Sequence, residues 1–89
     1  MMDEKKTLRQ AAALLKKGEK EDARQLLISL LKENPNSADT WWLLSYTVSK
    51  KEQQTDCLKR ALRLNAEHKR AHARLASLNN KPSPETPNP

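Results

Sequence analysis

The sequence predicts an all-α protein in which helical hairpins stack side by side as a solenoid. Three observations lead to this fold class. Leucine and alanine dominate the apolar residues, while phenylalanine is absent and glycine occurs once, a composition that favours helix over strand. Apolar residues recur at helical spacing between short polar breaks. The pattern of apolar helix, break and helix also occurs twice, and repeated helical hairpins are typical of solenoids.

The first two helices are expected over residues 3–17 and 20–33. In the first, the apolar stripe consists of Leu8, Ala11, Ala12 and Leu15. Gly18 is expected to end it in a left-handed conformation. The second carries an apolar face at i, i+3, i+4, i+7 and i+8, formed by Ala23, Leu26, Leu27, Leu30 and Leu31. Because only Gly18 and Glu19 separate the two helices, they must form an antiparallel hairpin.

A third helix is expected from Ser37 or Asn36, either of which can cap it, to about Val48. It contains every aromatic residue of the chain: Trp41, Trp42 and Tyr46. Trp41 lies on one apolar face, and Trp42 and Tyr46 lie on the adjacent face. A helix that is apolar on two faces needs neighbours on two sides, so this helix is expected to be the middle layer of the stack.

A fourth helix is expected over residues 50–64, almost without a loop, with Ser49 and Glu52 as a capping box. Its buried face is predicted to be Gln54, Cys57, Leu58, Ala61 and Leu62. A fifth helix, about 68–79, follows the break at Asn65-Ala66 and would bury Ala71, Leu75, Ala76 and Leu78. Residues 1–79 are therefore predicted to form one domain, and the proline-rich residues 80–89 a disordered tail.

The register of the repeat resembles that of the tetratricopeptide-repeat (TPR) family over roughly residues 4–79. With Pro35 at the family's closing proline, Gly18 falls at its turn position and Ala23 at its small second-helix position. The next repeat then places Trp41 on the signature Trp, and Leu44 and Ser45 on the Leu–small pair. The resemblance implies two TPR-like hairpins plus a C-terminal capping helix, and a role as a protein-binding adaptor or scaffold.

The second repeat departs from the family pattern. Pro35 and Ala66 are 31 residues apart, fewer than the usual 34 of a TPR. The missing residues are expected in the turn around residues 49–52, which also lacks a glycine. The chain thus resembles a short, bacterial-type variant with a clipped second repeat.

Charge is distributed unevenly along the chain. Residues 1–49 carry eight basic and seven acidic side chains, whereas residues 50–81 carry nine basic and three acidic ones. A basic second half favours acidic partners. Without a membrane-length apolar run or a signal-peptide core, and with a single cysteine, the chain is expected to be a soluble cytoplasmic protein.

No catalytic, metal or cofactor site is predicted, and the chain is not expected to be an enzyme. It has neither a glycine-rich phosphate loop nor a nucleophile elbow. Its clustered carboxylates suit a helix N-terminus. His68 and His72 are four residues apart, and Cys57 could be a third metal ligand. This spacing is nevertheless more typical of ordinary packing, with Cys57 as a small buried residue.

Partner binding is therefore the leading functional hypothesis. The resemblance places Trp42 and Tyr46 on the concave groove, either as ligand contacts or as packing residues, while Trp41 is expected in the hairpin core. The predicted partner-binding residues are Lys5, Leu8, Ala12, Trp42, Tyr46, Arg70 and Arg74. They would hold an apolar and acidic segment from another protein or peptide, or from a second copy of this chain in self-association. The alternative is a basic surface that binds nucleic acid or an acidic membrane, with nucleic acid the weaker expectation.

Overall fold

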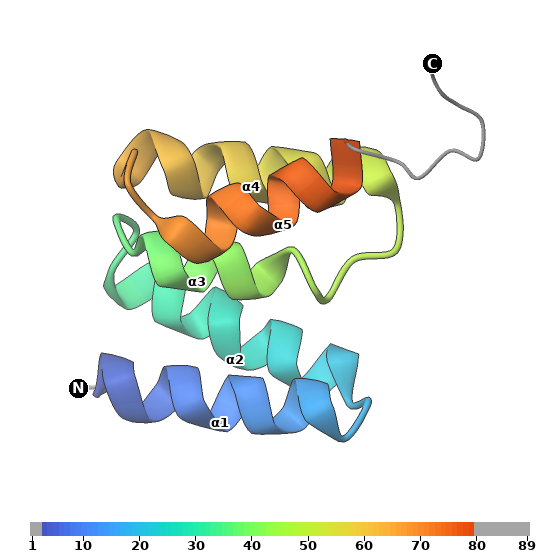
Figure 1. Cartoon of the computed structure of the whole chain (residues 1–89). Helices are drawn as coiled ribbons and strands as arrows, with labels where there is room; N and C mark the ends of the chain where they lie inside the picture. Colours follow the sequence, from blue (N-terminus) through green and yellow to red (C-terminus); the bar gives the residue numbers. More distant parts are fainter. Residues whose placement is uncertain (1–2, 80–89) are drawn as a thin grey trace, which may run out of the picture.

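Figure 1 presents a computed structural model of the chain, which describes residues 3–79. The described part is all-α and contains no strand. Its five helices are α1 (Glu4–Lys16), α2 (Lys20–Glu33), α3 (Ala38–Leu44), α4 (Lys51–Leu64) and α5 (Lys69–Asn79). The predicted fold class is confirmed at the level of all-α. The predicted disordered tail, residues 80–89, lies outside the described residues.

The first hairpin has the ends that its sequence predicts. Asp3 caps α1 by accepting a hydrogen bond from the Lys6 backbone N–H. At the other end, Gly18 has φ +84°. Its N–H donates to the Leu15 carbonyl and the Glu19 N–H donates to the Leu14 carbonyl, which is the hydrogen-bond pair of a Schellman motif. Only glycine adopts this φ without strain, so Gly18 fixes the turn into α2.

The α2–α3 joint, residues 34–37, is organised by asparagine. The Asn34 side-chain oxygen accepts the Asn36 N–H, and the Asn34 carbonyl accepts the Ser37 N–H. Ser37 then caps α3 by accepting the Thr40 N–H. Glu4 links the joint to α1, because its carboxylate accepts hydrogen bonds from the Asn34 amide at 3.0 Å and the Ser37 hydroxyl at 2.6 Å.

The α4–α5 joint, residues 65–68, repeats this arrangement. The Asn65 side-chain oxygen accepts the Glu67 N–H, and its carbonyl accepts the His68 N–H. His68 occupies the position of Ser37: its Nδ1 accepts the Ala71 N–H at 3.1 Å. Its Nε2 lies 2.6 Å from Asp39 Oδ1. Since Nδ1 accepts, the proton of the neutral ring is on Nε2 and is donated to Asp39.

The prediction that the third helix extends to Val48 is wrong, because α3 ends at Leu44. After Leu44 the backbone tightens to i→i+3 hydrogen bonds, since the Tyr46 N–H donates to the Leu43 carbonyl and the Thr47 N–H to the Leu44 carbonyl. Hydroxyl side chains share these last carbonyls: Ser45 Oγ donates to the Trp42 carbonyl at 2.6 Å, and Thr47 Oγ1 donates to the Leu44 carbonyl at 2.8 Å.

The expected tight entry into the fourth helix is also wrong. Residues 45–50 connect the helices, and α4 begins at Lys51 with Lys50 as a cap residue that makes no side-chain cap hydrogen bond. Ser49 is therefore not the cap. Gln54 stabilises the connection instead, since its Nε2 donates to the Val48 carbonyl at 2.9 Å. This amide satisfies a backbone group in a segment that lacks helical hydrogen bonds.

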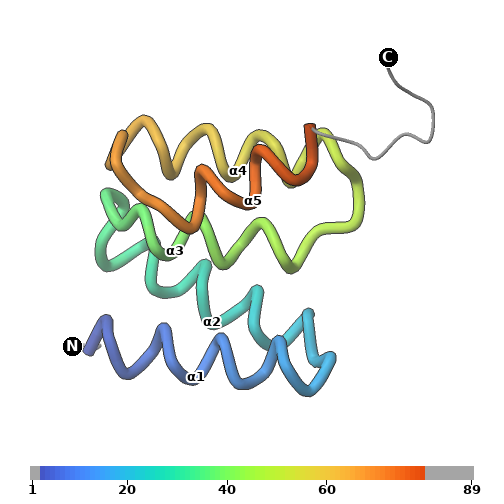
Figure 2. The backbone as a smooth tube through the Cα atoms, in the orientation of Figure 1, coloured from blue at the N-terminus to red at the C-terminus, as the bar shows by residue number. Residues whose placement is uncertain are grey.

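Each helix packs against the next one in the chain, and α3 contacts α1, α2 and α4. Figure 2 shows α3 in the middle, with α1 and α2 on one side and α4 and α5 on the other. The expectation that it is a middle layer therefore holds. One apolar cluster is centred on Ala11, Leu27, Leu43 and Leu44, and a second on Leu58, Ala61 and Ala71. Trp41 and Trp42 pack against both clusters. Adjacent indoles of α3 thus join the two halves of the core.

The predicted buried faces of α2 and α4 point inward, whereas the predicted face of α5 is partly wrong. Ala71 is buried and Leu75 and Leu78 are half-buried, but Ala76 and His72 are exposed. No further helix follows α5 in the described chain to cover that side. Among residues 3–79, no helix has both the length and the apolar character that crossing a bilayer requires.

Candidate functional site

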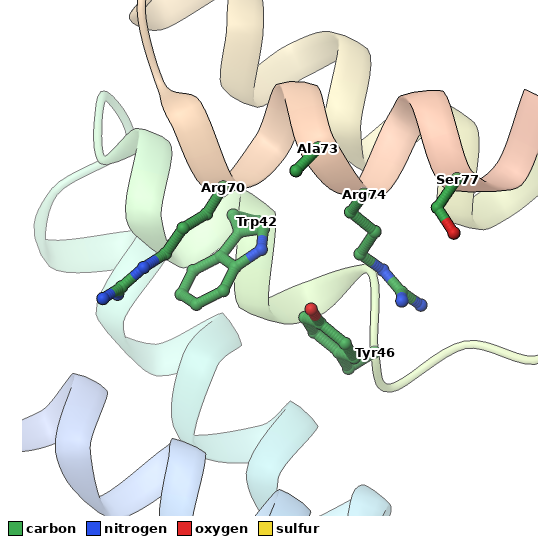
Figure 3. A pocket seen from close by; sticks show the side chains of 6 residues that line it. All are labelled: Trp42, Tyr46, Arg70, Ala73, Arg74 and Ser77. Atoms are coloured by element: carbon green, nitrogen blue, oxygen red, sulfur yellow. The ribbon is translucent and has the colours of Figure 1, made fainter.

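A hollow of the described surface lies between α3 and α5. It has a volume of about 460 Å³, within the range of ligand pockets. We call it the α3–α5 hollow, and Figure 3 shows the six residues that line it: Trp42, Tyr46, Arg70, Ala73, Arg74 and Ser77. Four of them, the two aromatic residues and the two arginines, are among the residues that the sequence predicts to bind a partner.

Arg74 is held in place by three contacts. Its Nε donates to Ser45 Oγ at 2.9 Å, and its Nη2 donates to the Ser45 carbonyl at 3.4 Å. The guanidinium carbon also lies 3.7 Å from the centroid of the Tyr46 ring, an arrangement that gives a cation–π attraction. A guanidinium group has five N–H donors, and two of those of Arg74 bond Ser45, so three remain for a ligand.

Arg70 and Trp42 form a second pair on the same side. The guanidinium carbon of Arg70 lies 5.3 Å from the Trp42 ring centroid. Tyr46 packs edge-on against the same indole, with 5.8 Å between centroids and an interplanar angle of 85°. The hollow therefore combines an aromatic floor with two stacked cations.

The indole nitrogen of Trp42 is a buried donor without an acceptor. Among residues 3–79, it is the side-chain nitrogen or oxygen that is buried and makes no hydrogen bond. Figure 3 shows it on the edge of the indole that faces Arg74. An unpaired buried polar group is destabilising, so this N–H is a donor that an acceptor from outside the described chain could satisfy.

Two smaller hollows lie on the α1 side of the same tryptophan. One, of about 310 Å³, is lined by Ala12, Leu15, Lys16, Trp42, Leu43 and Tyr46. The other, of about 200 Å³, is lined by Leu8, Arg9, Ala12, Asp39, Trp42, Leu43 and Arg70. We call these the α1–α3 hollows. Trp42 lines all three hollows, and we call the three together, across α1, α3 and α5, the groove surface.

The predicted site residues distribute over this surface with one exception. Leu8 and Ala12 line the α1–α3 hollows, and Trp42, Tyr46, Arg70 and Arg74 line the α3–α5 hollow. Lys5 is exposed on α1 and lines none of the three. Trp42 and Tyr46 are half-buried: they pack against the core and also line the hollows.

Positive charge dominates the groove surface. Arg9, Lys16, Arg70 and Arg74 line it, and within residues 3–79 none of them has a carboxylate within ion-pair distance. Asp39 is the acidic residue among the lining residues, and its carboxylate accepts a hydrogen bond from His68. The surface therefore offers unpaired cations around aromatic and aliphatic side chains.

Trp41 differs from its expected place. It is half-buried rather than enclosed in the hairpin core, and it lines a separate hollow of about 250 Å³ with Pro35, Arg60, Arg63 and Leu64. The guanidinium carbon of Arg60 lies 4.9 Å from its ring centroid. The position beside the α2–α3 joint leaves one side of the indole open.

The remaining reactive side chains do not assemble into a site in the described part of the chain. No group of three or more His, Cys, Asp or Glu residues is close enough to hold a metal ion among residues 3–79. His72 is not a packing residue; its Nε2 lies 2.6 Å from the Ala66 carbonyl, to which it donates. Burial raises the pKa of the Cys57 thiol, outweighing the opposing effect of Arg60, so the nucleophilic thiolate is disfavoured.

Two elements of the site are missed by sequence reasoning. Ser45 positions Arg74 across a separation of 29 residues. Asp39 holds His68, and the His68 ring lies 5.8 Å from the Trp42 ring. Neither pair has a periodic sequence signal, because each joins side chains from different helices. The match of Asn34 and Asn65 at the two breaks does indicate a shared joint, but it does not name the partners of the side chains there.

A comparison with protein families finds a match that covers most of the chain. The family model described as "Domain of unknown function (DUF7017)" matches residues 6–81. These residues include all five helices apart from the first two residues of α1. No curated protein and no solved structure matches the chain. The chain belongs to the DUF7017 family.

Proposed function

We propose that this domain is a protein-interaction module that holds an apolar and acidic segment of a partner against the groove surface. The observation that carries the proposal is the α3–α5 hollow, where two unpaired arginines stand over an aromatic floor. Aromatic residues and arginine are the residue types that contribute most to binding at protein interfaces. Acidic side chains of the partner would pair with Arg70 and Arg74.

The α1 side supports the apolar part of this proposal. Ala12, Leu15 and Leu43 line the larger α1–α3 hollow together with the aromatic pair. A partner side chain placed there would be removed from water against aliphatic and aromatic carbon, which is favourable in proportion to the apolar area buried. The partner segment would therefore cross α3, with apolar groups towards α1 and acidic groups towards α5.

We also propose that the arrangement is a short helical-repeat solenoid of the TPR type. The two joints support this, because Asn34 and Asn65 make the same hydrogen bonds at equivalent places. The helices that precede the joints, α2 and α4, are both 14 residues long, whereas α3 is 7 residues and α1 is 13. The clipped portion of the second repeat thus falls between Ser37 and Lys51. In such an array each hairpin contacts its neighbours and leaves an extended face for binding.

Selection of peptides from a random library rich in Asp, Glu, Leu and Val tests the proposal. We expect peptides to be recovered that bind the wild-type chain. The Trp42→Phe variant should bind them less tightly by about 1–2 kcal/mol, as for truncation of an interface anchor. Circular dichroism of the same variant should show an unchanged helix content, since phenylalanine keeps most of the packing.

The basic-surface alternative predicts a different result in the same assay. Binding to random-sequence single-stranded nucleic acid should then exceed binding to any selected peptide, and should fall steeply with salt. That result, or recovery of peptides whose binding does not change in Trp42→Phe, would contradict the proposal of a peptide-binding groove.

A further inference from the structure

We infer that the groove takes its partner as an extended segment, with a backbone carbonyl of that segment accepting the indole N–H of Trp42. This inference rests on the proposed function and names the conformation of the partner. The orphan N–H of Trp42 supports it independently of the charges. A ligand that leaves this donor unpaired would retain the desolvation penalty in the complex.

The hydrogen-bond donors of the α3–α5 hollow differ in strength, because the guanidinium groups are charged and the indole N–H is neutral. Carboxylates of a partner are attracted to the guanidinium groups of Arg70 and Arg74, because charge-assisted hydrogen bonds are stronger than neutral ones. The neutral indole donor is then left for a neutral acceptor. The most abundant neutral acceptor in any peptide is its backbone carbonyl.

The availability of carbonyls separates the two conformations that an acidic and apolar segment could adopt. In an α-helix each carbonyl already accepts the N–H four residues later, and only the last four remain free. In an extended segment that is not part of a sheet, no carbonyl has an internal partner. A helical partner could therefore satisfy the Trp42 N–H only at its C-terminal end, whereas an extended partner can do so along its length.

The N–H must be uncovered before it can bind. It exposes less than 1 Å² in the unbound structure, so a neighbouring group has to move. Figure 3 places Arg74 on the side of the indole that carries the nitrogen. Arg74 is held by Ser45 and Tyr46, contacts that a partner carboxylate can replace. The pairing of Arg74 with the ligand and the uncovering of Trp42 would then be one event.

Nuclear magnetic resonance of the indole N–H groups tests this inference directly. The full chain is labelled with ¹⁵N-tryptophan, and the Trp41→Phe variant assigns the two indole signals. One library-selected peptide is prepared in two forms, one kept extended by a central proline and one locked as a helix by a side-chain lactam. We expect the extended form to bind more tightly and to move the Trp42 indole proton downfield, while the Trp41 signal stays in place.

An isosteric change isolates the hydrogen bond. Benzothienylalanine at position 42 replaces the indole N–H by sulfur and keeps the ring size. We expect this substitution to lower the affinity for the extended peptide about fivefold, the effect of losing one ordinary hydrogen bond. The affinity for the locked helix should not change. Equal or tighter binding of the locked helix, or binding without movement of the Trp42 signal, would overturn the inference and leave the groove proposal standing. If neither form binds, both are overturned.

Discussion

The two joints of this domain share a backbone arrangement and differ in what their side chains do. In both, an asparagine turns the chain and the third residue after it caps the next helix. At the α2–α3 joint this residue is Ser37, whose hydroxyl is linked to Glu4. At the α4–α5 joint it is His68, which is linked to Asp39 and lies beside Trp42.

The exchange of serine for histidine at the capping position explains why only the α4–α5 joint supports the groove. A serine hydroxyl satisfies the polar groups of the joint and offers little apolar surface. An imidazole ring provides the same acceptor and donor and also covers part of an aromatic side chain. His68 thereby fixes the start of α5, and with it Arg70 and Arg74, relative to Trp42. The first joint therefore stabilises the fold alone, and the second also shapes the candidate site.

The largest effect on stability is expected at Trp41, beside the first joint. Trp41→Ala should lower the free energy of unfolding by about 3 kcal/mol, the lower end for truncating a large aromatic residue, because the half-buried ring packs against both core clusters. Urea denaturation followed by circular dichroism measures it. A loss below about 1 kcal/mol would show that the two clusters are not joined by this residue.

A smaller but broader effect is expected at the second joint. His68→Ala removes the cap of α5 and the Asp39 link, and should cost about 2 kcal/mol, somewhat more than the loss of a typical cap. It should also weaken binding of a selected peptide. His68→Asn, which can still cap, should recover part of the stability, and hydrogen exchange should show early opening of α5 in His68→Ala only.

The first joint should respond in stability without a change in binding. Ser37→Ala removes the acceptor for the Thr40 N–H and a donor to Glu4, and should cost about 1 kcal/mol. Isothermal titration with the same peptide should give an unchanged affinity. A binding defect in Ser37→Ala equal to that in His68→Ala would remove the distinction between the joints.

The smallest effect concerns Cys57. It belongs to α4 but packs against the apolar cluster centred on Ala11, Leu27, Leu43 and Leu44. Burial raises the pKa of its thiol above the ordinary value. The folded state therefore holds this proton more tightly than the unfolded state, and stability should decline slightly as pH rises above the ordinary thiol pKa. Iodoacetamide should react with Cys57 more slowly in the folded chain than in urea. Equal rates would mean that the contact between the halves opens readily.

Sequence reasoning predicts the parts of this molecule that depend on local pattern. The apolar spacing in α2 and the glycine after α1 determine those elements directly, so their positions follow from the sequence. The early end of α3 does not, because the change to i→i+3 hydrogen bonds at Tyr46 and Thr47 leaves the apolar spacing unchanged, and periodicity cannot detect it. The resemblance to the TPR family, rather than periodicity, led to the prediction that Trp42 and Tyr46 lie on the groove side.

The geometry that connects these residues could not be predicted. Contacts such as Arg74 with Ser45 and His68 with Asp39 join helices through side chains 29 residues apart. They depend on how α5 is placed over α3, which no local propensity specifies. Lys5 is the opposite case, a residue of α1 that the sequence predicts at the site but that lies outside the three hollows.

The most direct measurement compares two charge reversals in their affinity for a selected acidic peptide. Arg70→Glu with Arg74→Glu changes the groove surface, while Lys59→Glu with Arg63→Glu makes the same change of charge at the same spacing on the exposed side of α4. We expect the groove pair to weaken binding by at least about 2 kcal/mol and to flatten its dependence on salt. The α4 pair should stay within about 0.5 kcal/mol of the parent. An equal loss in both variants would contradict a groove-based site, because binding would then follow net charge alone.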